Sequence, residues 1–367
     1  MKFRMKRVLC ITANMNAGGA ETFLMKIYRR LDTSKYQMDF CVSAEKNVYE
    51  EEIIKRGGKV YKTPMKSRHP LKAFLSIKEI VSDYNYQYVM RINEHSLSVI
   101  DLIAARMGGA SRLIMRSSNS ASGGTLPTVL HKLCRFLPES IPDVKIAPSL
   151  LAAEYTFGKK NVKNNQVHIL NNGLDTSRFA FSKEWRDEIR AEYNISDKLV
   201  IGHVGRFNQQ KNHQFLIDIF NEVQKKNKNA VLMLVGEGVL LEEIQAKVSD
   251  LGILDKCIFT GLREDVNQLL SAMDLFLFPS LYEGMPNTVI EAQTSGLACL
   301  ISDSITKEAN VINRVEYMSL DRTPYEWADK LLSMHSTDRS KAYTDMNEQG
   351  YSIESVVEEF VKIVYES

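Results

Sequence analysis

Short apolar runs alternate with amphipathic segments along the first half of the chain. The runs read as buried strands because they are brief, rich in β-branched residues and bounded by turn residues. The segments between them, such as 71–83 and 97–107, space their apolar residues as helices do. The predicted strands of this half are 7–12, 38–42, 59–61, 88–92, 113–115, 144–147 and 167–170.

The pattern restarts after a cluster of turn residues at 171–175 and a polar helical connector at about 183–193. Helices at about 212–227, 239–251, 265–271 and 288–295 separate the strands of this second series. Those strands are 199–204, 230–235, 257–260, 275–278 and 298–301. The alternation predicts an α/β chain with two doubly wound, Rossmann-like parallel-sheet domains, 1–172 and 173–352. A last amphipathic helix, 353–365, needs a partner surface.

Composition agrees with a globular chain of two domains. The 367 residues are 44% hydrophobic and 25% charged, and no apolar run approaches the ~20 residues that cross a bilayer. The N-terminal apolar run is too short for a signal peptide. The five cysteines lack metal or redox spacing. We therefore expect a cytoplasmic protein with buried, reduced thiols.

The small net charge conceals an asymmetry between the two halves. Residues 1–171 carry 27 Lys and Arg against 14 Asp and Glu, a balance of +13, and residues 172–367 carry 20 against 31, a balance of −11. A basic domain joined to an acidic one indicates that the first domain faces something anionic. The alternative is that the two domains attract each other.

Two glutamates mark the loop and helix that follow the strand at 275–278. Glu283 lies in a loop with glycine and proline, and Glu291 lies eight positions later in the helix. Open α/β sheets bind ligands at the carboxyl ends of their strands, where this loop lies. We expect the two carboxylates to contact one ligand rather than to act as an acid/base pair.

A second cluster follows the first strand of the second domain. Arg206 and Lys211 lie five positions apart in a glycine-containing loop that leads into a helix. Two cations at a helix N-terminus form an anion site, most naturally for a diphosphate. A solvated basic loop is the alternative.

Glycines at other strand ends allow a ligand to approach the backbone closely. Gly236 follows the second strand of this domain, and Leu262 follows Gly261 at the end of the third. In the first domain, Gly18 and Gly19 open a helix without forming a complete dinucleotide motif. The sequence contains no Asp-x-Asp and no cluster with metal spacing, so we expect no metal and no other cofactor.

Together these motifs resemble the retaining family 4 glycosyltransferases of the GT-B fold, over nearly the whole chain. The matching stretches, in chain order, are 18–21, 172–175, 205–212, 235–238, 283–287 and Glu291. The segment 291–308 is most similar to glycosyltransferases of bacterial capsule and exopolysaccharide synthesis. The resemblance implies two domains that face each other across a cleft, with helix 353–367 crossing back onto the first.

The resemblance also implies a role for each motif. Arg206 and Lys211 would hold the diphosphate of a nucleotide sugar, Glu291 the ribose and Glu283 the transferred sugar. Catalysis would rest on Glu283, Arg206 and Lys211, which orient the sugar and neutralise the departing diphosphate. The donor-side residues are Gly18, Gly19, Arg206, Lys211, Gly236, Leu262, Glu283, Gly284, Met285, Pro286, Asn287 and Glu291.

The chain departs from the family pattern on the acceptor side. Histidines that relatives carry are replaced here, and His95 is either a catalytic substitute or an ordinary surface histidine. The arginines at the ends of two strands could instead hold an acceptor's phosphate. The acceptor-side candidates are Arg91, Asn93, Arg116, Ser118 and Asn119.

A basic run at 55–72 and an apolar stretch with interleaved cations at 124–138 have the composition of a membrane-surface segment. We expect both to face the anionic inner leaflet, unless 125–137 packs in the core and the run is merely solvated. No nucleic-acid motif accompanies the basic half, so a nucleic-acid partner is not expected.

The sequence therefore predicts a glycosyltransferase that moves a hexose or N-acetylhexosamine from a nucleotide sugar, preferably a UDP-sugar, to a saccharide or lipid-diphosphate-linked acceptor. Cell-surface glycan synthesis is the expected context. A GT-B enzyme of another class, such as an epimerase or a phosphorylase, is the main alternative, and a nucleic-acid-binding protein that uses the basic domain is a second one.

Overall fold

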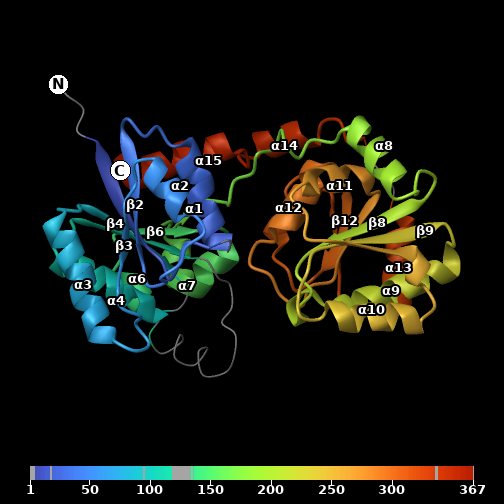
Figure 1. Cartoon of the computed structure of the whole chain (residues 1–367), viewed down its shortest axis with the longest axis horizontal. Coiled ribbons are helices and arrows are strands. Elements are labelled where there is room, and N and C mark those ends of the chain that lie inside the picture. The colour runs from blue at the N-terminus through green and yellow to red at the C-terminus, as the bar shows by residue number, and fades with distance from the viewer. Residues whose placement is uncertain are drawn as a thin grey trace. The chain divides into compact units, whose positions relative to one another are not determined.

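The chain forms two compact α/β units, one of residues Met1–Gly173 with Ile353–Ser367 and one of Leu174–Ser352 (Figure 1). The computed structural model describes residues 5–16, 19–93, 96–117, 134, 136–334 and 338–366. Within these ranges no helix has the length and apolar character needed to cross a membrane.

The first unit contains a seven-stranded sheet whose paired neighbours all run parallel. Its order is β3-β2-β1-β4-β5-β6-β7, so the direction of winding reverses between β1 and β4. The strands are β1 (Lys6–Ile11), β2 (Tyr36–Val42), β3 (Val60–Lys62), β4 (Tyr88–Asn93), β5 (Arg112–Ser117), β6 (Val144–Ala147) and β7 (His168–Ile169).

Helices cover this sheet, and the last of them comes from the far end of the chain. They are α1 (Gly19–Arg30), α2 (Glu50–Lys55), α3 (Pro70–Asp83), α4 (Ile100–Met107), α6 (Phe136–Ser140), α7 (Leu150–Lys163) and α15 (Ile353–Val361), with short turns η1 (Ser96–Val99) and η5 (Lys362–Glu366). Figure 1 shows α15 beside α1, and Phe360 of α15 meets Phe23 of α1 edge to face at 6.5 Å.

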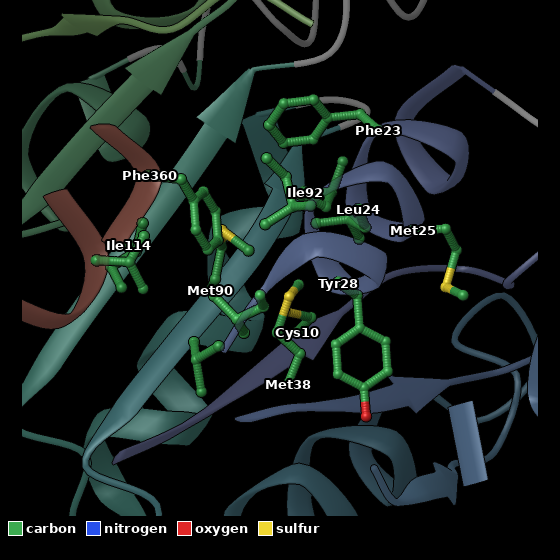
Figure 2. Close-up of a cluster of buried hydrophobic side chains, with 14 of the residues drawn as sticks. Cys10, Phe23, Leu24, Met25, Tyr28, Met38, Met90, Ile92, Ile114 and Phe360 are labelled. Carbon is green, nitrogen blue, oxygen red and sulfur yellow. The ribbon is translucent and has the colours of Figure 1, made fainter. Parts of the chain in front are cut away.

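One face of the first sheet forms a core with α1 and α15. Phe360 is completely buried, which contributes about 2–3 kcal/mol of hydrophobic free energy by area. The chain's last helix is thus part of this unit's core. Figure 2 shows side chains of this cluster, including Cys10, Phe23, Leu24, Met25, Tyr28, Met38, Met90, Ile92, Ile114 and Phe360.

The second unit contains a six-stranded parallel sheet of order β10-β9-β8-β11-β12-β13. Its winding reverses between β8 and β11. The strands are β8 (Leu199–Val204), β9 (Ala230–Val235), β10 (Cys257–Gly261), β11 (Leu275–Phe278), β12 (Ala298–Ser302) and β13 (Val315–Met318).

The helices of the second unit pack their apolar faces on both sides of its sheet. They are α8 (Lys183–Glu192), α9 (His213–Lys226), α10 (Leu241–Asp250), α11 (Val266–Ala272), α12 (Asn287–Thr294), α13 (Pro324–Ser333) and α14 (Ala342–Glu348), with turns η2 (Gln209–Lys211), η3 (Leu254–Lys256) and η4 (Lys307–Ala309).

The strands predicted from apolar runs are confirmed, most of them to within two residues at each end. The sequence pattern did not predict α2, α6, α7, β13, α13 or α14. In α7, Gly158 has φ +78° and interrupts the helical geometry. Strand β13 lies at the sheet edge, is four residues long and carries the exposed Glu316. Neither α7 nor β13 therefore shows a sustained period of apolar residues along the sequence.

Candidate functional site

The loops that follow β8 and β11 meet at the point where the second sheet reverses its winding. Strands β8 and β11 are neighbours in the sheet although about 70 residues separate them in the sequence. Their carboxyl ends open into residues 205–212 and 279–286. Open α/β sheets place their ligands in the crevice at such a reversal.

An ion pair joins these two loops. The Lys211 ammonium lies 2.6 Å from a carboxylate oxygen of Glu283. The two side chains are only 16% and 11% exposed, so the pair is largely screened from water. Lys211 Nζ also lies 4.6 Å from the ring centroid of Phe278, the last residue of β11. A cation–π contact therefore adds to the attraction.

Further hydrogen bonds hold the two loops in register. The backbone N–H of Leu281 donates to the Gln210 carbonyl at 2.8 Å, and the Gln210 side-chain amide donates to the Tyr282 carbonyl at 2.9 Å. The Asn212 amide donates to the Pro279 carbonyl at 3.1 Å. Sequence reasoning missed Gln210 and Asn212, whose polar side chains at a strand-to-helix turn were the available signal.

Glycines let the loop after β9 approach the loop after β8. Gly236 has φ +136°, and a Cβ built on it would lie 2.2 Å from the carbonyl oxygen of Gly205. No side chain fits there, and an L-residue would also be strained. The backbone N–H of Phe207 donates to the carbonyl of Glu237 at 2.9 Å, which fixes the close approach.

Arg206 and Leu262 extend from the same edge of the sheet into solvent. The Arg206 side chain is exposed and forms no ion pair or hydrogen bond with the described part of the chain. Leu262, after β10, is 76% exposed. A free guanidinium and an exposed apolar side chain near a buried ion pair could contact an anion and a flat ring.

The loop after β11 runs into α12, which begins at Asn287. Pro286 precedes the helix, and Met285 packs against the core. Glu291 lies one turn inside α12 and is half-buried. Gly284 is also half-buried. The helix thus presents its N-terminus beside Glu283, where its dipole favours negative charge.

Two hydroxyls in this region lack protein partners within the described ranges. The Ser280 Oγ and the Thr288 Oγ1 are buried without a hydrogen bond. Buried polar groups are normally paired. Ser280 and Thr288, which the sequence motifs did not include, are thus suited to bind a buried water molecule.

Two buried histidines lie behind the Lys211 loop. His203, on β8, donates its Nδ1–H to the Leu277 carbonyl oxygen at 2.9 Å, because a carbonyl can only accept. The His213 ring stacks on Phe207 at 4.1 Å and meets the His203 ring at 4.8 Å. Burial lowers the pKa of His203 well below its usual value and that of His213 to about 4, with Lys211 adding to both shifts.

In the first unit, Arg91 and Arg116 differ in how their charges are compensated. Arg91 lies 2.7 Å from the buried carboxylate of Asp101 and donates to the Ile11 carbonyl at 3.0 Å. Arg116 is 1% exposed, lies 3.7 Å above the Phe23 ring and donates to Asn172 at 2.6 Å. No described carboxylate pairs with Arg116, and burial lowers its pKa to about 9.

Several residues singled out in the sequence lie outside the described residues. They are Gly18, His95, Ser118, Asn119 and most of the stretch 124–138. Asn93 is the last residue of β4. Gly19 begins α1, and the space next to its Cα is open. Their predicted roles stay predictions.

No group of three or more His, Cys, Asp or Glu side chains converges within the described ranges in a way that could hold a metal ion. Of the carboxylates in the loop after β11 and in α12, Glu283 is paired with Lys211 and Glu291 is half-buried. The charged groups at this edge are thus suited to hold an anion flanked by hydroxyl groups.

The fold is that of the GT-B glycosyltransferases. A solved structure of Anabaena HepE in complex with UDP superposes with a TM-score of 0.81 at 16% identity, over 98% of this chain and 99% of that one. At this level of identity the likeness shows the fold alone.

Sequence comparison gives the family. The chain is 32% identical to the glycosyltransferase EpsF of Bacillus subtilis over 348 residues, which is 93% of this chain and 91% of that protein. The family model described as glycosyl transferases group 1 matches residues 198–337. The chain belongs to the group 1 glycosyltransferases.

A third comparison concerns a relative whose name states its substrates. The chain is 24% identical, over 242 residues, to the UDP-Gal:alpha-D-GlcNAc-diphosphoundecaprenol alpha-1,3-galactosyltransferase of Escherichia coli. The match covers 64% of this chain and 62% of that enzyme.

Proposed function

We propose that this glycosyltransferase is a retaining, metal-independent enzyme of family 4. It moves a hexose or N-acetylhexosamine from a UDP-sugar to a saccharide or a lipid-diphosphate-linked acceptor in cell-surface glycan synthesis. The observation that carries the proposal is the Lys211–Glu283 pair at the reversal point of the second sheet. It brings a cation for a diphosphate and a carboxylate for sugar hydroxyls within 2.6 Å of each other.

Each donor group then has a partner of matching chemistry. Lys211 and the exposed Arg206 bind the diphosphate together with the N-terminus of α9. Glu283 and the backbone of 284–286 bind the sugar, and Glu291 binds the ribose. Leu262 contacts the base. HepE, a protein of the same fold that has been solved with UDP-glucose, supports the choice of a uridine nucleotide.

The chemistry consists of charge neutralisation and orientation. As the bond between the sugar carbon and the diphosphate breaks, negative charge grows on the departing oxygen. Lys211 and Arg206 stabilise that charge in this proposal, an effect that is often worth about 10²–10³ in rate for a single group. Glu283 orients the sugar for the acceptor hydroxyl. A catalytic role for His95 stays a prediction.

The acceptor belongs to the first unit in this proposal. Arg116 is the stronger candidate for a phosphate on the acceptor's saccharide, because its guanidinium has no described carboxylate partner. A lipid-diphosphate acceptor is supported by the name of the Escherichia coli relative.

The enzyme is also proposed to bind the inner face of the cytoplasmic membrane peripherally. The first half carries the +13 balance, and Leu71 and Leu75 of α3 are 70% and 44% exposed beside Arg68 and Lys72. Apolar side chains among cations bind anionic interfaces. Flotation with anionic liposomes at low salt tests this, and a protein that stays unbound contradicts it.

The decisive experiment offers the purified protein UDP-Glc, UDP-Gal, UDP-GlcNAc, UDP-GalNAc and GDP-Man, and measures nucleotide release. One UDP-sugar should release UDP slowly alone and faster with acceptor, and excess EDTA should leave the rate unchanged. NMR of the product should show the donor's anomeric configuration. Release from no donor, or an inverted product, contradicts the proposal.

A further inference from the structure

A pocket of about 390 Å³ lies in the first unit at the carboxyl ends of β1, β2 and β4. It spans the point where this sheet reverses its winding, the usual ligand position in such sheets. Its volume is within the range of small-molecule sites. The lining residues that bear on its ligand are Met65, Lys66, Ser67, Phe74, Arg91, Ile100 and Asp101.

One wall of this pocket is apolar and partly open to solvent. Met65, Phe74 and Ile100 line it, and Met65 and Ile100 are 49% and 42% exposed. Leu71, on the first turn of α3, is 70% exposed close by in the sequence. A cluster of exposed apolar side chains around a cavity marks a binding surface rather than an ordinary solvated face.

The same pocket lining also carries a cationic group of side chains. Asp101 is ion-paired with both Lys66 and Arg91, so two positive charges meet one negative charge. Arg68 and Lys72 are exposed nearby and form no ion pair within the described ranges. Burial and the neighbouring Arg91 lower the pKa of Lys66. An added anion near Lys66 would relieve that excess of positive charge.

The combination selects an amphiphilic ligand. A free saccharide would need dense hydrogen bonding, which an apolar wall of methionine, phenylalanine and isoleucine does not offer. A purely apolar chain would leave the excess cation unpaired. A ligand with an apolar chain next to an anionic head matches both kinds of lining side chain.

We propose that this pocket binds the isoprenoid segment nearest the phosphates of a lipid-diphosphate-linked acceptor, with the diphosphate beside Lys66. The inference rests on the proposed function and adds a subsite to it. The pocket thereby selects acceptors by their lipid, independently of the sugar to be extended.

Direct binding of farnesyl diphosphate, measured by calorimetry, tests the pocket without any transfer reaction. Ser67→Trp, at an exposed lining position, should block the mouth and weaken binding at least tenfold. Lys66→Met should weaken it as well. Ser82→Trp, at an exposed position of α3 outside the lining, is the matched control and should bind like the original chain.

Two further ligands separate the chain from the head group. Inorganic diphosphate alone and farnesol alone should each bind more weakly than farnesyl diphosphate. Equal affinity for inorganic diphosphate, or unchanged farnesyl diphosphate binding in Ser67→Trp, overturns the inference. A parallel loss of binding to plain anionic phospholipid vesicles in Ser67→Trp also overturns it, because this surface would then bind the lipid bilayer rather than a single isoprenoid ligand.

The transfer reaction distinguishes failure of the subsite from failure of the proposed function. Ser67→Trp should raise the KM for a lipid-diphosphate-linked saccharide at least tenfold. The KM for the same saccharide offered as a methyl glycoside should not change. The slow rate of UDP release without acceptor should not change either. An equal rise for both acceptors contradicts the subsite, whereas no UDP release by the original chain contradicts the proposed function.

Discussion

Breaking the Lys211–Glu283 ion pair should strengthen the binding of UDP while it slows transfer. Glu283→Gln keeps the size and hydrogen-bonding capacity of the side chain but removes its charge. At 2.6 Å the attraction between unit charges is about 6 kcal/mol for an effective dielectric constant of about 20. Desolvation of both groups offsets most of it, so a net contribution of about 1–2 kcal/mol is expected for a pair that is 16% and 11% exposed.

Two consequences have opposite signs. Without ligand, Lys211 loses its counter-ion, and a loss of about 1–2 kcal/mol lowers the Tm of a unit of this size by roughly 2–8 °C. With UDP present, the diphosphate no longer competes with Glu283 for Lys211. The affinity for UDP should then rise by up to about tenfold, since 1.4 kcal/mol is tenfold.

Calorimetric titration with UDP measures the change in affinity, and thermal unfolding measures the change in Tm. The rate of transfer by Glu283→Gln should fall by about 10²–10³, because the sugar loses its charged partner. Glu237→Gln is the control, since Glu237 is an exposed carboxylate in the loop after β9 and has no described ion pair. Weaker or unchanged UDP binding by Glu283→Gln would refute the reasoning.

Three other outcomes are expected. The pKa of His213 is about 4 in the folded chain and about 6.5 in an unfolded one. The free energy of unfolding should therefore be highest above about pH 6.5 and about 2 kcal/mol lower at about pH 5. His213→Phe should remove this pH-dependent loss of about 2 kcal/mol, which urea unfolding at both pH values measures. Gly236→Ala should destabilise the chain by about 3 kcal/mol in chemical denaturation, because its Cβ meets Gly205, whereas Gly252→Ala, in open space with φ +67°, should cost only about 1 kcal/mol. Arg116→Met should raise the KM for a phosphate-bearing acceptor without changing the KM for the donor. If steady-state assays give the variant and the original chain the same KM for that acceptor, Arg116 does not bind its phosphate.

The strands could be predicted because each is a short apolar run between polar segments, a signal that is local to the sequence. The order of the strands could not be read in the same way, although the alternation predicted a parallel sheet. Strand β13 shows the limit, because an edge strand with Glu316 in its middle has no apolar alternation. The pairing partner, rather than the sequence itself, makes it a strand.

The donor side was predictable as a set of residues but not as a set of contacts. Lys211 and Glu283 were assigned to one edge of the sheet from their positions after strands. Their ion pair depends on how two loops 72 residues apart fold against each other, and no local pattern encodes that distance. The hydrogen bonds of Gln210 and Asn212, which set it, were missed for the same reason.

The two arginines of the first unit show why burial changes the interpretation of a charged residue. From sequence, Arg91 and Arg116 looked equivalent, since each lies toward the end of a strand. Arg91 is ion-paired with Asp101, a carboxylate that Lys66 shares, and this pairing accounts for the burial of Arg91. Arg116 is equally buried without a described carboxylate, and a cation–π contact of about 2 kcal/mol with Phe23 does not offset the several kcal/mol that burying a lone charge costs. A contribution to folding stability does not explain why the Arg116 guanidinium is buried. An anion that arrives with the acceptor explains it better.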